Sequence, residues 1–128
     1  MKIPSSVSSL ERISNFILKT PLIKSERLSS SAQNVYMKLE NMQKTGSFKA
    51  RGALNKIYNL DLVDEIVTAS SGNHGAAVSY ALKTKNISGK IYVPQSAKKS
   101  KIDKIESYGS EVIVFGDCLL YTSDAADE

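Results

Sequence analysis

Hydrophobic and polar positions divide the second half of this chain into short apolar runs and segments of helical spacing. Three runs rich in Val and Ile predict β-strands, at residues 66–69, 91–93 and 112–115. Two segments whose apolar residues recur three and four positions apart predict helices, at residues 75–83 and 96–108. Gly109 is placed to end the second helix. Strands that alternate with helices indicate a parallel sheet with right-handed crossovers.

The first half of the chain has a weaker pattern. Apolar positions at helical spacing predict a helix over residues 5–18. Thr20 ends this segment, because a residue that precedes proline is pushed out of the α region. A strand is expected at residues 35–39, and residues 40–45 connect it to the next element.

A turn and a helix meet at Lys49. Gly46 and Ser47 are expected as a turn and an N-cap, and apolar positions from Ala50 onward have helical spacing. Lys49 then lies in the first helical turn, where the positive end of the helix dipole lowers the pKa of its amine. That effect is worth at most about 2 kcal/mol. Desolvation would have to supply the rest of the shift that a neutral, nucleophilic amine needs. On this segment alone, a lysine that extends into solvent is an equal alternative.

A second segment, Ser-Ser-Gly-Asn-His-Gly at residues 70–75, lies between a predicted strand and a predicted helix. Its backbone N–H groups would point outward at a helix N-terminus, a geometry that holds a phosphate or a carboxylate. An activatable lysine and an anion site on successive α/β units suggest carbonyl chemistry on an anionic ligand. The alternatives are an Asn73 that is simply tolerated in a turn and a His74 that packs or caps.

Residues 38–53, followed by residues 70–75, resemble the fold-type II pyridoxal-phosphate enzymes, in particular the threonine/serine dehydratase and serine racemase group. The resemblance runs from about residue 20 to about residue 116. Two sister branches fit less well, since threonine synthases carry Asp where Ala50 stands and cysteine synthases carry Thr where His74 stands. The resemblance implies an α/β fold of parallel open sheets with flanking helices, pyridoxal 5′-phosphate as cofactor and a small amino acid as substrate.

The resemblance also implies roles for individual residues. Lys49 would form the Schiff base with the cofactor and serve as the catalytic base. Phe48 would pack against the cofactor ring, with a core phenylalanine as the alternative, and Asn73 would hydrogen-bond the cofactor's 3′ oxygen. The loop that binds the substrate carboxylate would consist of Ser70, Ser71, Gly72, Asn73 and His74.

Ser71 bears on the type of reaction. Racemases of this group use a serine here as the acid/base on the face opposite the lysine, whereas many threonine dehydratases carry alanine. Some dehydratases carry the double serine as well, so Ser71 permits racemisation without establishing it. The resemblance therefore implies a threonine/serine ammonia-lyase, which eliminates the β-hydroxyl to give a 2-oxo acid and ammonia. Serine racemase is one alternative, and a non-catalytic module that binds phosphate or nucleic acid is another.

The resemblance covers only part of such an enzyme. Residues 1–59 would be the amino-terminal part of the large domain, and residues 60–117 part of the small domain. In the family, the glycine-rich loop that holds the cofactor phosphate lies further along the chain. Residues 118–128 look like a translated sequencing adapter, with a native acidic tail as the alternative. We expect such a fragment to be marginally stable or to aggregate, because its strand edges and apolar faces lack partners. The full-length parent would be a homo-oligomer.

Composition narrows the class of protein. The chain has 128 residues, of which 41% are hydrophobic and 23% charged, as is usual for a soluble globular protein. No apolar run approaches a membrane span and no signal-peptide pattern opens the chain, so we expect a cytoplasmic protein without a membrane partner. The single cysteine, Cys118, excludes an internal disulfide and a cysteine-cluster metal site, and no metal is expected.

The net charge raises nucleic acid as a partner. The formal net charge is +4, and without the tail 17 basic residues would face only 10 acidic ones. Four lysines gather on the predicted helix 96–108, but no aromatic residue lies among them and Asp103 and Glu106 interrupt them. The sequence therefore favours a solvated helix face over a nucleic-acid site. The lysines in question are Lys98, Lys99, Lys101 and Lys104.

Overall fold

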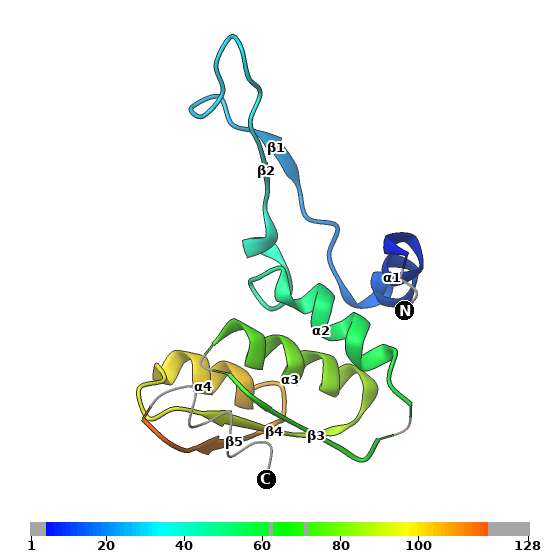
Figure 1. Ribbon diagram of the computed structural model, residues 1–128, viewed down its shortest axis with the longest axis vertical. Helices are drawn as coiled ribbons and strands as arrows, with labels where there is room; N and C mark the ends of the chain where they lie inside the picture. The colour runs from blue at the N-terminus through cyan, green and yellow to red at the C-terminus, as the bar shows by residue number, and fades with distance from the viewer. Residues whose placement is uncertain (1–4, 62, 71, 118–128) are drawn as a thin grey trace.

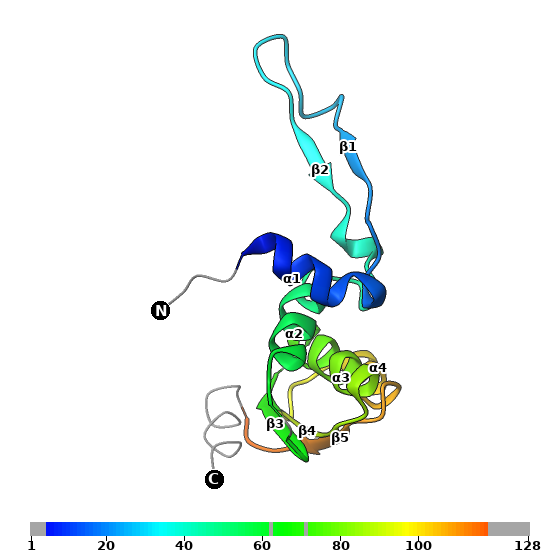
Figure 2. The ribbon, with the colours of Figure 1, turned by 90° about the vertical axis from the view of Figure 1, so that its right-hand side faces the viewer.

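The alternating pattern of the second half folds as the parallel sheet that it predicts. The computed structural model describes residues 5–61, 63–70 and 72–117, and its three parallel strands lie in the order β3-β4-β5. Their bounds are Glu65–Ala69, Ser88–Val93 and Glu111–Val114. The crossover helices α3 (Asn73–Lys85) and α4 (Lys99–Glu106) cover one face of the sheet. Helix α2 (Lys49–Tyr58) lies on the outer side of α3 (Figure 1, Figure 2).

The core lies between the sheet and these helices. Ile91 and Val93 of the central strand β4 are 0% and 1% exposed. Helix α3 buries three alanines, Ala76, Ala77 and Ala81. These small side chains let α3 lie close both to α2 and to the sheet. Gly89 keeps the sheet contact close, because a Cβ at this position would stand 2.3 Å from Cδ1 of Leu82.

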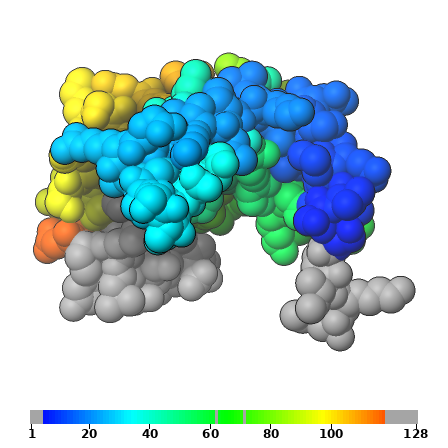
Figure 3. Space-filling view, turned by 90° about the horizontal axis from the view of Figure 1, so that it is seen from above, coloured from blue at the N-terminus to red at the C-terminus, as the bar shows by residue number. Residues whose placement is uncertain are grey.

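The first half of the chain forms a helix and a projecting hairpin. Helix α1 (Ser6–Ile13) starts after Ser5, whose Oγ accepts the N–H of Val7 at 3.2 Å. One 3-10 turn, η1 (Ser14–Phe16), follows it, so the expected helix over residues 5–18 ends early. Strand β1 (Leu22–Lys24), which the pattern did not predict, pairs antiparallel with β2 (Tyr36–Lys38). Figure 3, seen from the hairpin end, shows the hairpin in light blue and cyan in front of the other elements.

Two predicted helices have different bounds from those expected. Helix α3 begins at Asn73, earlier than predicted, and ends at Lys85, beyond the expected residue 83; its C-cap, Asn86, has a left-handed backbone (φ 57°). The expected helix over residues 96–108 is only α4, because the N–H of Ala97 closes a turn onto the carbonyl of Pro94 at 2.9 Å and the next residue is extended. Gly109 follows that helix with φ +93°, as a terminating glycine should.

In the part of the chain that the structure describes, no helix is long and apolar enough to cross a membrane. Nor do the described residues bring together three or more His, Cys, Asp or Glu side chains that could hold a metal ion. The tail over residues 118–128, with Cys118, lies outside the described residues.

Candidate active site

The candidate site lies where α2 and α3 begin. Both helices start on the side of the molecule where β3 ends, and they pack against each other along their length (Figure 1). Their first residues are Lys49 and Asn73. Partial burial lowers the pKa of His74, and the nearby charge of Lys49 lowers it further. The two segments that the sequence singled out therefore come together in space.

The turn before Lys49 differs from the expected one. Gly46 has φ +74°, which suits a glycine, and its N–H donates to the carbonyl of Gln43 at 2.6 Å. Ser47 is not the N-cap of α2, which was a wrong prediction. Phe48 occupies that position in a helical conformation, and its carbonyl accepts the N–H of Arg51 at 3.0 Å. The Oγ of Ser47 is buried and has no hydrogen-bond partner among the described residues.

Lys49 and Phe48 both present their side chains to solvent. Lys49 is exposed at the first position of α2, which is the alternative of a lysine that extends into solvent, and the described residues do not supply the desolvation that the sequence argument required. Phe48 is 64% exposed, so the alternative of a core phenylalanine is wrong. An accessible amine next to an accessible aromatic ring can react with a carbonyl group and cover a planar ligand on one side.

Ser70 shapes the entry into α3. It is 5% exposed, and its Oγ accepts the N–H of Gly72 at 3.2 Å and that of Gly75 at 2.8 Å. Gly75 must remain small, because a Cβ there would stand 3.0 Å from Cδ1 of Ile105. The hydroxyl of Ser70 therefore satisfies two amides of the loop. Ser71, for which the resemblance implies a role in substrate binding and as an acid/base, lies outside the described residues.

The sequence placed Asn73 and His74 in the loop before the helix. In the structure both lie in the first turn of α3. No described residue accepts the backbone N–H of either one. Within the described part of the chain, these two amides are therefore donors that the helix N-terminus offers to an anion. Partial desolvation, and secondarily the charge of Lys49, lowers the pKa of His74, which favours its neutral ring.

Two lysines of α4 reach this region, and the sequence reasoning had left them on a solvated face. Lys101 Nζ donates to Oδ1 of Asn73 at 3.0 Å. Lys104 Nζ donates to the carbonyl of Thr45 at 2.8 Å, in the turn that precedes Lys49. The predicted topology could have shown that these lysines lie near the site, because successive crossover helices in a parallel sheet start at the same edge. The start of α4 was therefore bound to lie near the start of α3.

An ion pair holds the start of α2 from the other side. Arg51 donates to both carboxylate oxygens of Glu40, at 2.9 and 2.8 Å. Thr20 Oγ1 donates to the same carboxylate. The Arg51 hydrogen bonds lower the pKa of Glu40 to about 2, against the opposing effect of burial. The pair fixes α2 to η2 (Glu40–Met42), the 3-10 turn that follows β2.

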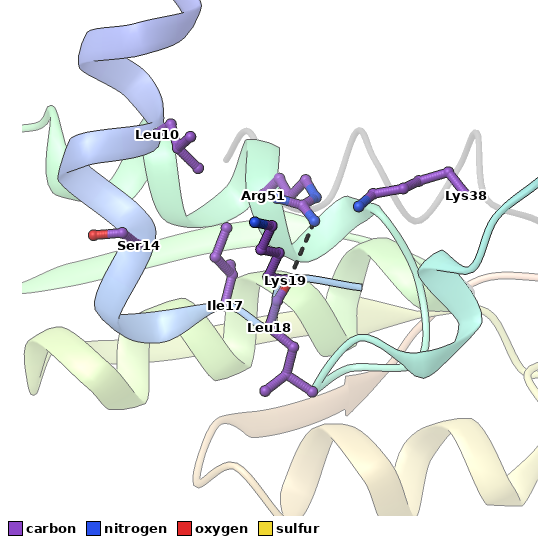
Figure 4. Close-up of a pocket in the computed structure, with 7 residues that line it drawn as sticks. All are labelled: Leu10, Ser14, Ile17, Leu18, Lys19, Lys38 and Arg51. Carbon is purple, nitrogen blue, oxygen red and sulfur yellow. Dashed lines mark hydrogen bonds between the residues drawn. The ribbon is translucent and has the colours of Figure 1, made fainter. Parts of the chain in front are cut away.

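A pocket lined by α1, the segment after η1 and Arg51 lies apart from the starts of α2 and α3 (Figure 4). Figure 4 shows Arg51 on one side of the pocket, with a hydrogen bond of 3.4 Å to the carbonyl of Leu18. Neither Lys49 nor the start of α3 lines this pocket. Its remaining lining residues are Leu10, Ser14, Ile17, Lys19 and Lys38. It consequently plays no part in the chemistry argued for Lys49.

The residues at the two helix starts fit one end of pyridoxal phosphate. The set comprises the accessible amine of Lys49, the accessible ring of Phe48 and the amide donors of Asn73 and His74. The buried, unpartnered Oγ of Ser47 is a further polar group in the segment that carries the lysine. These groups suit the aldehyde, ring and phenolic oxygen of the cofactor, whereas no phosphate-binding loop is among them.

Comparison with known proteins gives consistent results. A family model described as pyridoxal-phosphate dependent enzyme matches residues 13–128. A serine racemase of Dictyostelium discoideum is 44% identical over 106 residues, which are 80% of this chain and 33% of that protein. A catabolic L-threonine dehydratase of Staphylococcus aureus is 44% identical over 127 residues, or 91% of this chain and 36% of that protein. The chain thus spans about a third of the length of these curated relatives.

A solved structure gives the same result for the fold. The structure of maize serine racemase superposes with a TM-score of 0.87 at 32% identity, over 94% of this chain and 38% of that one. The expected α/β fold with a parallel sheet and flanking helices is therefore confirmed as part of a fold-type II architecture.

Proposed function

This chain belongs to the family of pyridoxal-phosphate dependent enzymes, and from that premise we propose that its parent protein is a threonine/serine ammonia-lyase. The reaction would remove the β-hydroxyl of the amino acid and release a 2-oxo acid and ammonia. The observation that carries the proposal is the meeting of Lys49, at the start of α2, with the amide donors at the start of α3. The likeness to a threonine dehydratase at 44% identity supports the choice of substrate.

The proposed roles follow from the chemistry of each side chain. Lys49 would join the aldehyde carbon of the cofactor and afterwards accept the α-proton of the substrate on Nζ. When bound, pyridoxal phosphate supplies the electron sink that makes this proton acidic. Phe48 would cover one face of the ring, since its side chain is free of core contacts. Asn73 would donate from Nδ2 to the phenolic oxygen, because its Oδ1 is already engaged.

The substrate carboxylate would bind at the start of α3. The backbone N–H groups of Asn73 and His74 are free of described partners and lie at the positive end of that helix. Gly72, whose own N–H is held by Ser70, keeps the approach open because it has no side chain. Ser70 would act by shaping this loop, and Ser71 would contribute an acid/base group. A neutral His74 would add no competing charge.

Titration with the cofactor tests the lyase proposal. The intact protein should develop the visible absorbance of a lysine-bound pyridoxal phosphate and then form 2-oxo acid from L-threonine or L-serine. Lys49→Ala should remove both signals, while Lys56→Ala, exposed in the last turn of the same helix, should keep them. If Lys49→Ala keeps the visible band, the site assignment is wrong. If ligand binding survives in Lys49→Ala but catalysis was never present, a non-catalytic binding module is the better description.

Serine racemisation is a second candidate, favoured by Ser71 in the sequence and by the 44% identity to a serine racemase. In this reading Ser71 exchanges a proton on the face opposite Lys49. Ser71→Ala should then abolish formation of D-serine and largely spare formation of 2-oxo acid. Equal loss of both products would argue against a separate racemising role.

We also propose that the parent protein is a cytoplasmic homo-oligomer that binds neither nucleic acid nor a membrane. Of the four lysines on the predicted helix 96–108, Lys101 hydrogen-bonds Asn73 and Lys104 hydrogen-bonds Thr45. These contacts within the chain weaken the case for a surface that binds nucleic acid. Exposed apolar side chains on the hairpin, among them Leu22 and Tyr36, are suited to contact with further protein. Light scattering on the intact protein would test the oligomeric state, and a nucleic-acid binding assay would test the statement about nucleic acid.

A further inference from the structure

Asn73 has a partner that its proposed role does not explain. Lys101, in the first turns of α4, donates from Nζ to Oδ1 of Asn73 at 3.0 Å, across 28 positions of sequence. Lys101 as a whole is half-buried, whereas Asn73 is exposed. The parallel β-α-β topology brings the starts of α3 and α4 to the same edge of the sheet, which makes the contact possible.

The chemistry of the two groups sets the orientation of the amide. A lysine ammonium has three donors and no acceptor, so only the oxygen of a carboxamide can face it. With Oδ1 turned toward Lys101, the two N–H groups on Nδ2 are left for another partner. The cation also polarises the carboxamide, and this strengthens Nδ2 as a donor. The side chain of Asn73 is thereby prepared for a ligand oxygen that carries negative charge.

We propose that Lys101 is a positioning residue, which holds Asn73 so that its Nδ2 donates to the phenolic oxygen of pyridoxal phosphate. The proposal rests on the proposed function, because it assigns the ligand oxygen to that cofactor. Lys101 acts through Asn73 and does not touch the reacting atoms itself.

The contact is not required to hold α4 in place. Ser79 Oγ, buried in α3, donates to the carbonyl of Ile105 at 2.9 Å and lies 2.7 Å from Oγ of Ser110. Ile105 is fully buried in the core. These hydrogen bonds and the packing of Ile105 attach α4 to α3 independently of Lys101. Loss of the Lys101 hydrogen bond should therefore leave the fold intact. A purely structural role for Lys101 therefore predicts little effect on the cofactor.

A double-mutant cycle separates the two roles. Pyridoxal phosphate is titrated into the intact apoprotein, and its dissociation constant and the position of the visible band are measured. Lys101→Met should weaken binding by about tenfold and shift the band, because a charge-assisted hydrogen bond is lost. In the Asn73→Ala background the same change should alter the dissociation constant by less than about twofold, because its target is already absent. Lys101→Arg should restore near-normal binding.

Lys99→Met is the matched control, since Lys99 lies on the same helix and its side chain has no hydrogen bond among the described residues. Equal dissociation constants for Lys101→Met and Lys99→Met would overturn the proposal, as would a full tenfold loss in the Asn73→Ala background. If the wild-type protein does not bind the cofactor, the proposed function fails first and the proposal fails with it.

Asn73→Asp gives a second test that does not depend on how Lys101→Met folds. The aspartate keeps an oxygen for Lys101 but replaces the Nδ2 donor with a second oxygen, which would repel the phenolic oxygen. It should bind pyridoxal phosphate more weakly than Asn73→Ala does. Binding as tight as that of the wild type would contradict the orientation that we assign.

Discussion

The parallel sheet unit (residues 65–114) and the hairpin (residues 22–38) both carry large apolar side chains, many of which the sheet unit buries and the hairpin leaves exposed. In the sheet unit, Ile91 and Val93 of β4 are 0% and 1% exposed. In the hairpin, Leu22 and Tyr36 are 63% and 57% exposed, and every residue of both strands is exposed. The sheet unit has its own core, whereas the hairpin presents a surface that further protein could cover. The candidate site lies at the border of the two, where α2 begins.

Core truncation should give the largest difference between the two regions. Ile91→Ala removes a buried side chain from the central strand and should cost about 2–4 kcal/mol of the free energy of unfolding. Leu22→Ala, at an exposed hairpin position, should change it by less than about 0.5 kcal/mol. Urea unfolding of the 128-residue chain, followed by helical circular dichroism, measures both. Equal effects of the two substitutions would mean that the hairpin shares the core.

The ion pair at the border should give the next largest effect. Because the folded-state pKa of Glu40 is about 2, against an ordinary value of 4.5, its contribution is fully present above pH 4.5. Stability should then fall as the pH drops from about 4.5 toward 2, when the carboxylate takes up its proton. Glu40→Gln should cost about 2 kcal/mol at pH 7 and flatten this acid limb. An unchanged pH profile in the variant would show that Glu40 does not anchor α2.

Lys104 should give a smaller and more local effect. Its Nζ donates to the carbonyl of Thr45, and the hydroxyl of Tyr108, which follows α4, donates to the carbonyl of Lys44 at 3.2 Å. The turn before Lys49 is thus held through two successive carbonyls, one of them by α4. Lys104→Met should cost about 1 kcal/mol and raise amide exchange around Gly46 by about fivefold, without changing exchange in β4. Lys83→Met, which loses a 3.5 Å contact to Ser107, is the control. Faster exchange throughout the sheet would indicate global destabilisation instead.

The same comparison explains how much of the fold the sequence could predict. In the sheet unit, the apolar runs and the apolar positions at helical spacing are the residues that the fold buries. The sequence pattern therefore predicted all three strands and both crossover helices. Strand β1 was missed because Leu22, Ile23 and Lys24 form only three exposed residues without alternation. Its pairing depends on a partner twelve or more residues away, which no local pattern shows.

The site was predictable where local backbone geometry decides it. The position of Lys49 at the start of a helix followed from the spacing of apolar residues after it, and the structure confirms it. The N-cap role of Ser47 was wrong, because Phe48 already has a helical backbone. The contacts of Lys101 and Lys104 were missed because the lysines were judged as a charge pattern on an isolated helix, whereas the sheet topology determines what they face.

The central claim is that Lys49 is the lysine that binds pyridoxal phosphate. Borohydride reduction of the cofactor-loaded intact protein, followed by peptide mapping with mass spectrometry, tests it directly, because reduction fixes the cofactor to the lysine that carries it. We predict one modified peptide, with the cofactor on Lys49 and unmodified Lys44, Lys56 and Lys101. Modification of another lysine, or modification spread evenly over several, would contradict the assignment of the site.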